Sequence, residues 1–400
     1  MTPSPDMVRP RAAYIHVPFC AHKCGYCNFT VIAGRDDLES VYLAALAREL
    51  SATLRAPCQV DTLFLGGGTP TQLSVEATCR LLDMLHHWLP LRDDAEVTCE
   101  ANPNDCTEEK LRLLRQYGVN RLSIGGQSFS RGKLEVLERR HTPEQLRDAL
   151  ETATAIFPEV ALDLIFAAPG ETLKDWHADL DAAIDSGVVH LSTYGLTIER
   201  GSAFYGRMLR GALVEVDEER QLEMYLAAID RLGQVGWDHY EVSNFCLPGN
   251  RCRHNQTYWT GEFWWGFGAG AAAFLPAAEL PAWRRSAEPI VGWRRVNHRS
   301  TVAYLRRIDQ ERPWWEECAP ITREQWIREQ LVFGLRQLDG VDLRRLDERW
   351  GEGVEPLFEP HLSRFLEQGL LMREDQHLRL TRRGLVISDS LWPPLLEPGT

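Results

Sequence analysis

Short apolar runs alternate with longer helical patterns over the first 240 residues of the chain. The apolar runs occupy residues 13–17, 60–65, 96–100, 121–124, 161–166 and 190–196. Between them, helical patterns cover residues 38–54, 75–89, 108–117, 143–156 and 173–186. Such alternation, at about 30 to 40 residues per unit, is typical of parallel strands joined by helical crossovers. Six units fit, so the sequence predicts an α/β fold built on a partial, TIM-like (β/α)6 barrel, two units short of a complete barrel.

Beyond the sixth strand the pattern changes character. We expect one further helix over residues 217–236 and a strand over 238–244. Residues 246–293 are rich in Trp, Gly and Pro and only weakly periodic, which predicts a loop-rich layer. From residue 321 onward the pattern is helical, and residues 378–381 resemble the β-wing of a winged helix. The predicted organisation is a core over 1–240, a loop-rich covering segment over 241–310, a small helical, winged-helix-like C-terminal module over 311–392 and a frayed tail over 393–400.

The chain is acidic, with 44 Lys and Arg residues against 57 Asp and Glu residues. This balance argues against nucleic acid as a partner, because a basic surface is needed to bind the phosphate backbone. The first 13 residues contain no apolar run of the kind found in signal peptides. No stretch approaches the roughly 18 apolar residues of a membrane span. We therefore expect a cytoplasmic protein whose thiols stay reduced.

In a reducing compartment, the 10 cysteines are expected to be ligands or buried thiols and not disulfides. Most of the scattered ones are interpreted as small apolar core residues. These are Cys58, Cys79, Cys99, Cys106, Cys246, Cys252 and Cys318. The other three, Cys20, Cys24 and Cys27, form a C-x3-C-x2-C motif directly after the first predicted strand.

This cysteine motif has two chemical interpretations. A structural zinc site needs four ligands and would have a second Cys or His pair close by, which the sequence lacks. Three thiolates suit an iron–sulfur cluster in which one iron has no protein ligand and is open to a small molecule. The motif therefore predicts a [4Fe–4S] cluster at the mouth of the partial barrel.

The segment from Tyr14 to Cys27 resembles the cysteine motif of the radical S-adenosylmethionine superfamily. That resemblance implies that the amino and carboxylate groups of S-adenosylmethionine chelate the open iron. It also implies that one electron from the reduced cluster cleaves the C–S bond to give a 5′-deoxyadenosyl radical. The protein would position the sulfonium and exclude water. The sequence does not identify the electron donor.

Polar or glycine-rich positions follow successive predicted strands. Residues 66–70 form a Gly-Gly-Gly-Thr-Pro turn that lets a ligand approach the backbone. Glu100 ends the third strand and suits ribose hydroxyls or an ammonium group, and Gln127 follows the fourth. Arg139 can pair with a carboxylate, and Asp163 is a charge inside an apolar strand. Each alone is more often a surface or capping residue, but together they fall where barrel enzymes build active sites.

A narrower resemblance, to the oxygen-independent coproporphyrinogen III oxidase group, covers essentially the whole chain, including the C-terminal module. It is carried by residues 62–70, 100–103, 120–129, 163–171, 194–201 and 217–225. The resemblance implies a set of residues that contact S-adenosylmethionine. They are Tyr14, Tyr26, Gly67, Gly68, Thr69, Glu100, Gln127, Arg139, Asp163 and, through its backbone, Gly195.

This group contains two functions, an oxidase that decarboxylates coproporphyrinogen III and a haem chaperone. The oxidase has a further cysteine two residues after the third ligand, where this chain has Phe29. Residues 254–259 match the H-N-x-x-Y-W motif of the chaperone branch, and the lead before Tyr14 is short. The resemblance therefore favours a chaperone that binds haem and delivers it to acceptor proteins, with respiratory haemoproteins as candidates and membrane association only through partners. Oxidase activity is the alternative.

His254 is the expected haem ligand, with Tyr258 and Trp259 offering aromatic surface to the porphyrin. The alternative is that His254 hydrogen-bonds a neighbouring strand and the two aromatic residues belong to the core. Cys252 is a second conceivable ligand, although a buried thiol is the simpler interpretation. Where the family commonly has His-Ser, this chain has Ala272 and Ala273. If that histidine helps to bind haem, this chain lacks it.

Overall fold

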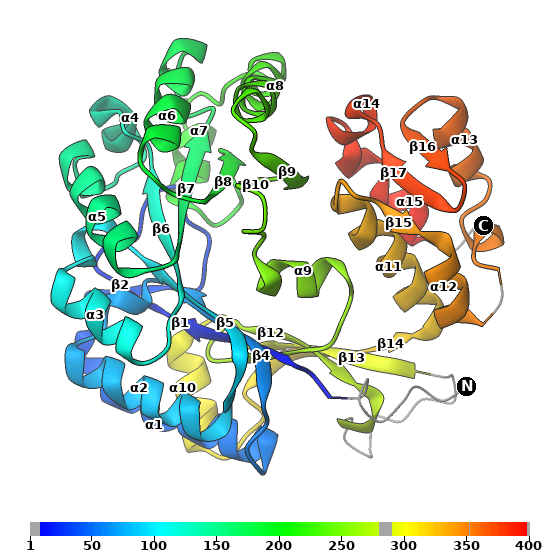
Figure 1. Ribbon diagram of the computed structural model, residues 1–400. Coiled ribbons are helices and arrows are strands. Elements are labelled where there is room, and N and C mark those ends of the chain that lie inside the picture. Colours follow the sequence, from blue (N-terminus) through cyan, green and yellow to red (C-terminus); the bar gives the residue numbers. More distant parts are fainter. Residues whose placement is uncertain (1–8, 280–289, 352, 398–400) are drawn as a thin grey trace.

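A computed structural model describes residues 9–279, 290–351 and 353–397. Its centre is six parallel strands that lie side by side in chain order (Figure 1). They are β1 (Ala12–Val17), β4 (Val60–Gly67), β5 (Leu91–Ala101), β6 (Arg121–Gln127), β7 (Glu159–Phe166) and β8 (His190–Gly195). The predicted partial barrel is therefore confirmed.

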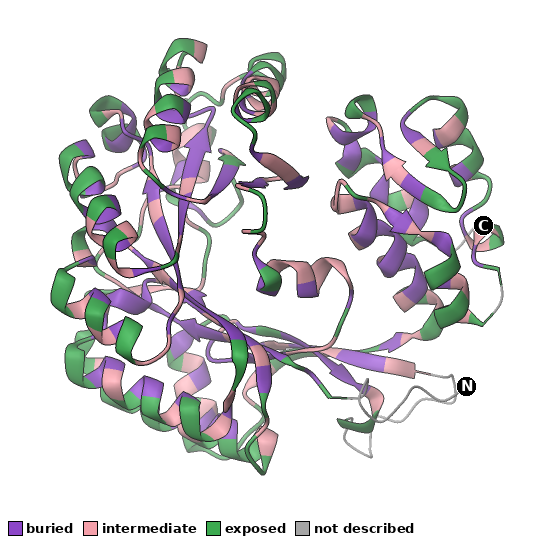
Figure 2. Ribbon diagram, viewed as in Figure 1, coloured by how far each residue is buried: buried purple, intermediate pink, exposed green. Residues whose placement is uncertain are grey.

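Helices on the outer face of these strands connect one strand to the next. They are α1 (Glu39–Leu54), α2 (Val75–Trp88), α3 (Glu108–Gln116), α4 (Arg131–Val136), α5 (Pro143–Ile156), α6 (Leu173–Asp185), α7 (Ala203–Leu209) and α8 (Glu218–Gln234). Ser74, Thr107 and Thr142 cap α2, α3 and α5 by accepting a backbone N–H in the first turn, as their sequence positions predict. Figure 2 shows the strands buried and the outer faces of the helices exposed.

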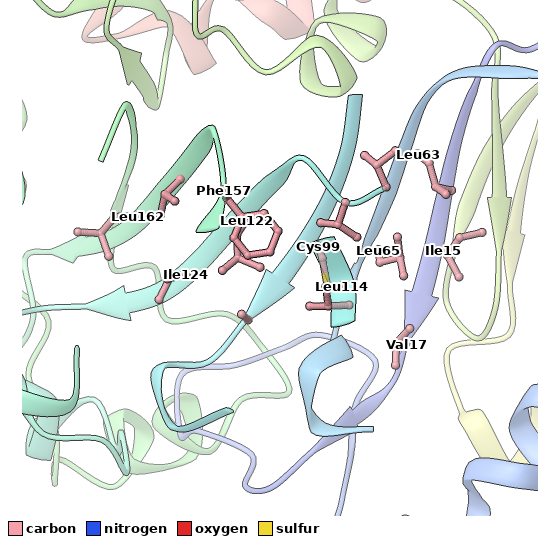
Figure 3. Packing of buried hydrophobic residues seen from close by; sticks show 14 of the residues in the cluster. Ile15, Val17, Leu63, Leu65, Cys99, Leu114, Leu122, Ile124, Phe157 and Leu162 are labelled. Atoms are coloured by element: carbon pink, nitrogen blue, oxygen red, sulfur yellow. The ribbon is translucent and has the colours of Figure 1, made fainter. Parts of the chain in front are cut away.

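The two faces of the barrel strands differ in chemistry. Apolar side chains such as Leu63, Leu122 and Ile124 pack in the core shared with the helices (Figure 3). The alternate positions, among them Arg121 and Ser123, face a cavity inside the barrel. A (β/α)8 barrel normally fills its interior with Val, Ile and Leu, so a polar interior indicates space for a ligand.

The sheet continues past residue 240 in both directions. At one edge β9 (Asp238–Glu241) and β10 (Asn244–Cys246) form a hairpin on β8. At the other, β11 (Trp264–Phe267) pairs parallel with β1, and an antiparallel series follows. This series is β12 (Ala272–Pro276), β13 (Ile290–Asn297) and β14 (Trp315–Thr322), which complete a 12-stranded sheet. Two further short strands, β2 (Phe19–Cys20) and β3 (Ile32–Ala33), flank the cysteine loop.

Two expectations for this region are wrong. Residues 246–293, where described, are not a loop-rich layer but contain α9 (Arg253–Trp259) and three of the added strands. Two of these strands, β11 and β12, are only four and five residues long, too short for a period-two pattern to stand out. The strand expected over 238–244 is two strands joined by a turn. Helix α10 (Thr301–Asp309) then follows β13.

The C-terminal module has its own apolar core, which includes Ile327, Leu331 and Leu395. Its elements are α11 (Arg323–Arg336), β15 (Val341–Asp342), α12 (Leu343–Trp350), α13 (His361–Glu367), β16 (Leu371–Glu374), β17 (His377–Leu380), α14 (Arg382–Leu385) and α15 (Trp392–Leu396). The β15–β17–β16 sheet beside these helices agrees with a winged-helix-like module. The frayed tail expected over 393–400 is wrong up to residue 396, because α15 buries Leu395 completely. Residues 398–400 lie outside the described part.

None of the helices in the described chain combines the length and the hydropathy that a membrane-spanning helix needs.

Candidate functional site

The three motif cysteines lie in the segment that directly follows the C-terminal end of β1, between β1 and β3. A turn closed by the Cys27 N–H donating to the Cys24 carbonyl at 3.1 Å brings these two residues together. The loop is held from the side by α7, where the Phe204 N–H donates to the Gly25 carbonyl at 2.8 Å. A side chain at Gly25 would meet the Phe204 ring at 2.3 Å, so this approach requires glycine.

The surroundings of the thiols suit an anionic iron–sulfur cluster. Arg139 Nη1 lies 3.6 Å from Cys24 Sγ, and Thr69 Oγ1 lies 3.5 Å from Cys20 Sγ. Burial raises the pKa of the Cys20 thiol to about 11 and also raises that of Cys27. The Cys20 and Cys27 thiols are therefore neutral, and metal binding would release their protons. A guanidinium group beside the loop compensates the negative charge that follows.

The donor set of the loop bears on the two metal interpretations. A structural zinc site needs four ligands, whereas three thiolates suit a [4Fe–4S] cluster in which each cysteine binds a different iron and the fourth iron is open.

The glycine turn after β4 is hydrogen-bonded to the backbone at the start of the cysteine loop. The Gly68 N–H donates to the Val17 carbonyl at 2.8 Å, and the Thr69 N–H donates to the Phe19 carbonyl at 2.7 Å. Gly67 has a φ of +105°, and the N–H of this residue donates to Glu100 Oε2 at 2.9 Å. The turn thus joins the ends of β1, β4 and β5 beside the cysteines.

Arg139 and Asn102 connect these strand ends to the loop. Arg139 Nη2 donates to Asn102 Oδ1 and to the Gly125 carbonyl, both at 2.6 Å. Asn102 Nδ2 in turn donates to Thr69 Oγ1 at 2.8 Å. The buried Nε of Arg139 has no partner among the described residues, which leaves a donor for a ligand. Sequence reasoning missed Asn102, although its place two residues after Glu100 and before a proline was a usable signal.

Gln127 ends β6 in a conformation that non-glycine residues seldom adopt. Its φ is +66°, and the two following residues are held by Asp179, which accepts from Ser128 Oγ and from the Phe129 N–H, both at 2.7 Å. Such a backbone persists only where its surroundings impose it, and it is frequent at ligand sites. The remaining predicted residues also lie near the mouth: Tyr26 packs against Phe204 at 6.2 Å, and Gly195 ends β8 beside Phe166.

Below the mouth the barrel encloses a cavity of about 220 Å³. Five predicted residues line this cavity, namely Tyr14, Glu100, Asp163, His254 and Tyr258. The sequence-based reasoning missed the rest of the lining, which is Phe64, Arg121, Ser123, His190, Ser192, Tyr194 and Asn255. A signal was available, because polar residues recur at every second position of β6 and β8.

His254 lies inside this cavity and is 1% exposed. Its Nδ1 lies 2.8 Å from Thr62 Oγ1 on β4, and its Nε2 lies 2.8 Å from the Tyr258 hydroxyl. The ring also stacks on Phe64 at 5.1 Å. Burial lowers the pKa of His254 to about 3, so the imidazole is neutral. Both ring nitrogens are thus engaged within the protein, as in the alternative interpretation of this motif.

The other motif residues also point into the protein. Cys252 is fully buried, with its Sγ 3.5 Å from Glu96 Oε1. Trp259 faces the C-terminal module, where the Arg336 guanidinium lies 4.8 Å from its ring. Ala272 is exposed at the start of β12, and Ala273 is buried. Phe29, by contrast, is 69% exposed on the cysteine loop, so the apolar ring at this position faces outward.

The protonation state of Glu100 makes the free energy of unfolding depend on pH. Burial, followed by the negative charge of Asp163, raises the pKa of Glu100 from 4.5 to about 8. Between these pH values the folded protein retains a proton that the unfolded chain has released. The stabilisation is therefore full below about pH 4.5 and is lost as the pH rises to about 8. We expect Glu100→Gln to flatten this fall in the unfolding free energy, measured by denaturant titration of the metal-free protein.

The exposed Glu135 provides a matched control for this measurement. Glu135→Gln should leave the pH profile of the wild type unchanged. Parallel profiles for the wild type and Glu100→Gln would show that Glu100 titrates normally.

Comparisons with known proteins agree with this geometry. Residues 14–183 match the radical SAM superfamily, and residues 321–387 match the HemN C-terminal domain. The heme chaperone HemW of Bacillus subtilis is 35% identical over 96% of this chain and 99% of its own length. HemW of Mycobacterium tuberculosis strain H37Rv is also 35% identical, over 97% of this chain and 95% of its own. Mouse mitochondrial radical S-adenosyl methionine domain-containing protein 1 is 31% identical, over 98% and 89% of the two chains.

Among solved structures, coproporphyrinogen III oxidase (HemN) from Escherichia coli superposes with a TM-score of 0.83. The superposition covers 97% of this chain and 90% of HemN, at 22% sequence identity. At that identity the likeness shows a common fold, from the barrel to the C-terminal module. The relatives that are 31% to 35% identical over nearly their whole length show more than a common fold, because they establish the family. The chain belongs to the heme chaperone HemW family within the radical S-adenosylmethionine superfamily.

Proposed function

We propose that this protein is a haem chaperone that binds a [4Fe–4S] cluster, S-adenosylmethionine and haem, and delivers haem to acceptor proteins. The observation that carries the proposal is the 35% identity to the B. subtilis heme chaperone over 96% of this chain. Phe29 supports it, because the oxidase of the same group has a cysteine at this position. A coproporphyrinogen oxidase is therefore the less favoured function.

Different residues at the barrel mouth would hold the cluster and S-adenosylmethionine. Cys20, Cys24 and Cys27 would bind three irons, and Arg139 offsets their negative charge from 3.6 Å. Glu100 and Asp163 on the cavity wall would accept hydrogen bonds from the amino group and the ribose hydroxyls of S-adenosylmethionine. When bound, the reduced cluster supplies the electron that cleaves the C–S bond of S-adenosylmethionine.

Haem is the cargo in this proposal and not a resident cofactor. The acceptor proteins would be haemoproteins, respiratory ones included, and the protein would reach a membrane only through these partners. A cytoplasmic location is supported by the 10 cysteines, all of which are free thiols.

The proposal is tested by offering both candidate compounds to the anaerobically reconstituted protein. We expect stoichiometric haem uptake, read from the visible absorbance of haem, and transfer to an apo-haemoprotein. With coproporphyrinogen III, S-adenosylmethionine and a reductant, we expect no protoporphyrinogen. The matched control is bacterial HemN, which should give the product under the same conditions. Turnover of coproporphyrinogen by this protein, or failure to take up haem, would overturn the proposal.

A further inference from the structure

Two neighbouring strands of the barrel end in backbone conformations that residues with a side chain seldom adopt. Gln127, the last residue of β6, has a φ of +66°, and Ala167, directly after β7, has a φ of +61°. Such conformations persist only where the contacts around them impose them. Each of the two strand ends must therefore be held by its neighbours in the fold.

A buried carboxylate holds each of these strand ends. Asp179 on α6 accepts from Ser128 Oγ and from the Phe129 N–H, both at 2.7 Å. Glu171, just before α6, accepts from the Ala168 N–H at 2.9 Å. The side chains of Asp179 and Glu171 are only 2% and 1% exposed. Both carboxylates thus bind backbone or side-chain donors that directly follow a residue of positive φ.

The ammonium group of Lys133 joins the two carboxylates. Lys133 Nζ lies 2.9 Å from Asp179 Oδ2 and also donates to Glu171 Oε1. The Lys133 side chain is 4% exposed, and its Nζ lies 5.1 Å from the centre of the Trp176 ring. No other cation of the described chain pairs with either carboxylate. Apolar side chains of similar size often stabilise a core as well as a buried ion pair does, so stability alone does not explain this cluster.

Lys133 lies on α4, which runs beside α6 and leads to Arg139 (Figure 1). The Arg139 N–H donates to the Leu134 carbonyl at 2.9 Å, which fixes this residue to the end of α4. Its side chain returns to β6, because Nη2 donates to the Gly125 carbonyl at 2.6 Å. Nη1 of the same guanidinium lies 3.6 Å from Cys24 Sγ. The segment from Gly125 to Arg139 is therefore a closed loop, and Lys133 anchors its middle to α6.

We propose that Lys133 is a positioning residue for the iron–sulfur site: it fixes the ends of β6 and β7 and thereby holds the Arg139 guanidinium beside the cysteine loop. The inference rests on the proposed function only in taking a [4Fe–4S] cluster as the group that the three cysteines bind. The ammonium donates to Asp179 and Glu171, so it acts on Arg139 through the backbone of β6 and α4. Without this charge the two buried carboxylates would repel each other, and both strand ends would lose their fixed partners.

The first experiment measures hydrogen exchange in the metal-free protein. Lys133→Met removes the charge and keeps a side chain of similar length. The amides of residues 127–130 and 167–170 should then exchange about tenfold faster or more, because the carboxylates that accept from them are no longer held in place. The matched control is Lys174→Met, which replaces an exposed lysine of α6 and should exchange like the wild type. Unchanged exchange in Lys133→Met would overturn the inference.

The second experiment measures the midpoint potential of the reconstituted cluster, by redox titration followed through the EPR signal of the reduced form. A cation beside a cysteine ligand favours the reduced, more negative cluster, so Arg139→Gln should shift the potential to a more negative value. Lys133→Met should shift it in the same direction. Because Lys133 acts through Arg139, the double variant should shift no further than Arg139→Gln alone. A lysine that only stabilised the fold would lower the melting temperature and leave the potential unchanged.

A wild-type potential in Lys133→Met, or additive shifts in the double variant, would overturn the inference. Lys174→Met should keep the wild-type potential. If Lys133→Met does not fold, Asp179→Asn decides by the same two measurements, since it removes the charge opposite Lys133 and keeps the size of the side chain. Wild-type values in that variant would reject the inference. Wild-type protein that takes up no iron and sulfide would instead refute the cluster part of the proposed function, whereas the exchange rates of the metal-free protein concern Lys133 alone.

Discussion

Replacement of Cys24 by alanine is expected to reduce iron and sulfide in the anaerobically reconstituted protein to background. The cluster has only three protein ligands, so the loss of one leaves two irons without a thiolate. Cys24 is also the thiol that Arg139 contacts, at 3.6 Å. S-adenosylmethionine binding should disappear with the cluster, because the open iron is its anchor. Iron and sulfide assays, visible absorbance and equilibrium dialysis measure these three quantities.

A second cysteine variant distinguishes the loss of a cluster ligand from a general effect of cysteine replacement on folding. Cys79 on α2 is partly buried and lies away from the loop, so Cys79→Ala should reconstitute like the wild type. The melting temperature of metal-free Cys24→Ala should also match that of the metal-free wild type, since Arg139 is the one hydrogen-bond partner of the Cys24 thiol among the described residues. A Cys24→Ala protein that still holds four irons and four sulfides would refute the ligand assignment.

The barrel could be predicted from sequence because its signals are local. Each strand is a short apolar run, and caps such as Thr142 mark the start of the next helix within a few residues. The candidate cofactor residues followed for the same reason: Glu100, Gln127 and Asp163 stand at or near strand ends, and parallel strands bring those ends together. The C-x3-C-x2-C motif then identified which end of the barrel carries the site.

The features that were missed depend on pairing between distant segments. β11 is four residues long and exists because its backbone pairs with β1, about 250 positions earlier in the sequence. The partners of His254 include Thr62, 192 positions away, so no local pattern could show that both ring nitrogens are occupied. Arg121 and His190 face the cavity because of strand orientation, which a single sequence indicates only through alternation.

Because the interior of the barrel is polar, apolar packing inside it cannot by itself stabilise the fold. Arg121 Nε and Nη2, His190 Nδ1 and Thr98 Oγ1 are buried without a hydrogen-bond partner among the described residues. Unpaired buried polar groups are destabilising, so a protein keeps them where a ligand or water uses them. The fold must therefore obtain its stability from the outer apolar layer and from the polar networks that fix the added strands.

Glu49 is the centre of the most completely buried of these networks. This carboxylate is 0% exposed on α1 and accepts from the Gly268 N–H at 2.8 Å, from Asn297 Nδ2 at 2.7 Å and from the Tyr304 hydroxyl at 2.6 Å. Arg295, itself 3% exposed, lies 3.6 Å away. The network joins α1 to β13, α10 and the turn after β11. It also adjoins the cysteine loop, because Gly270 in the same turn lies against Thr30.

Glu49→Ala should lower the free energy of unfolding by about 3–5 kcal/mol, because it leaves the Arg295 charge and three donors buried without their acceptor. Denaturant titration of the metal-free protein, followed by tryptophan fluorescence, measures this loss. The control on the same helix is Glu39→Ala, whose exposed carboxylate binds Ser74 and should contribute under about 1 kcal/mol. In the double variant Glu49→Leu with Arg295→Met, the charge is removed as well, so the loss should be smaller than the sum of the two single losses. A Glu49→Ala protein as stable as Glu39→Ala would show that the network does not hold the added strands to the barrel.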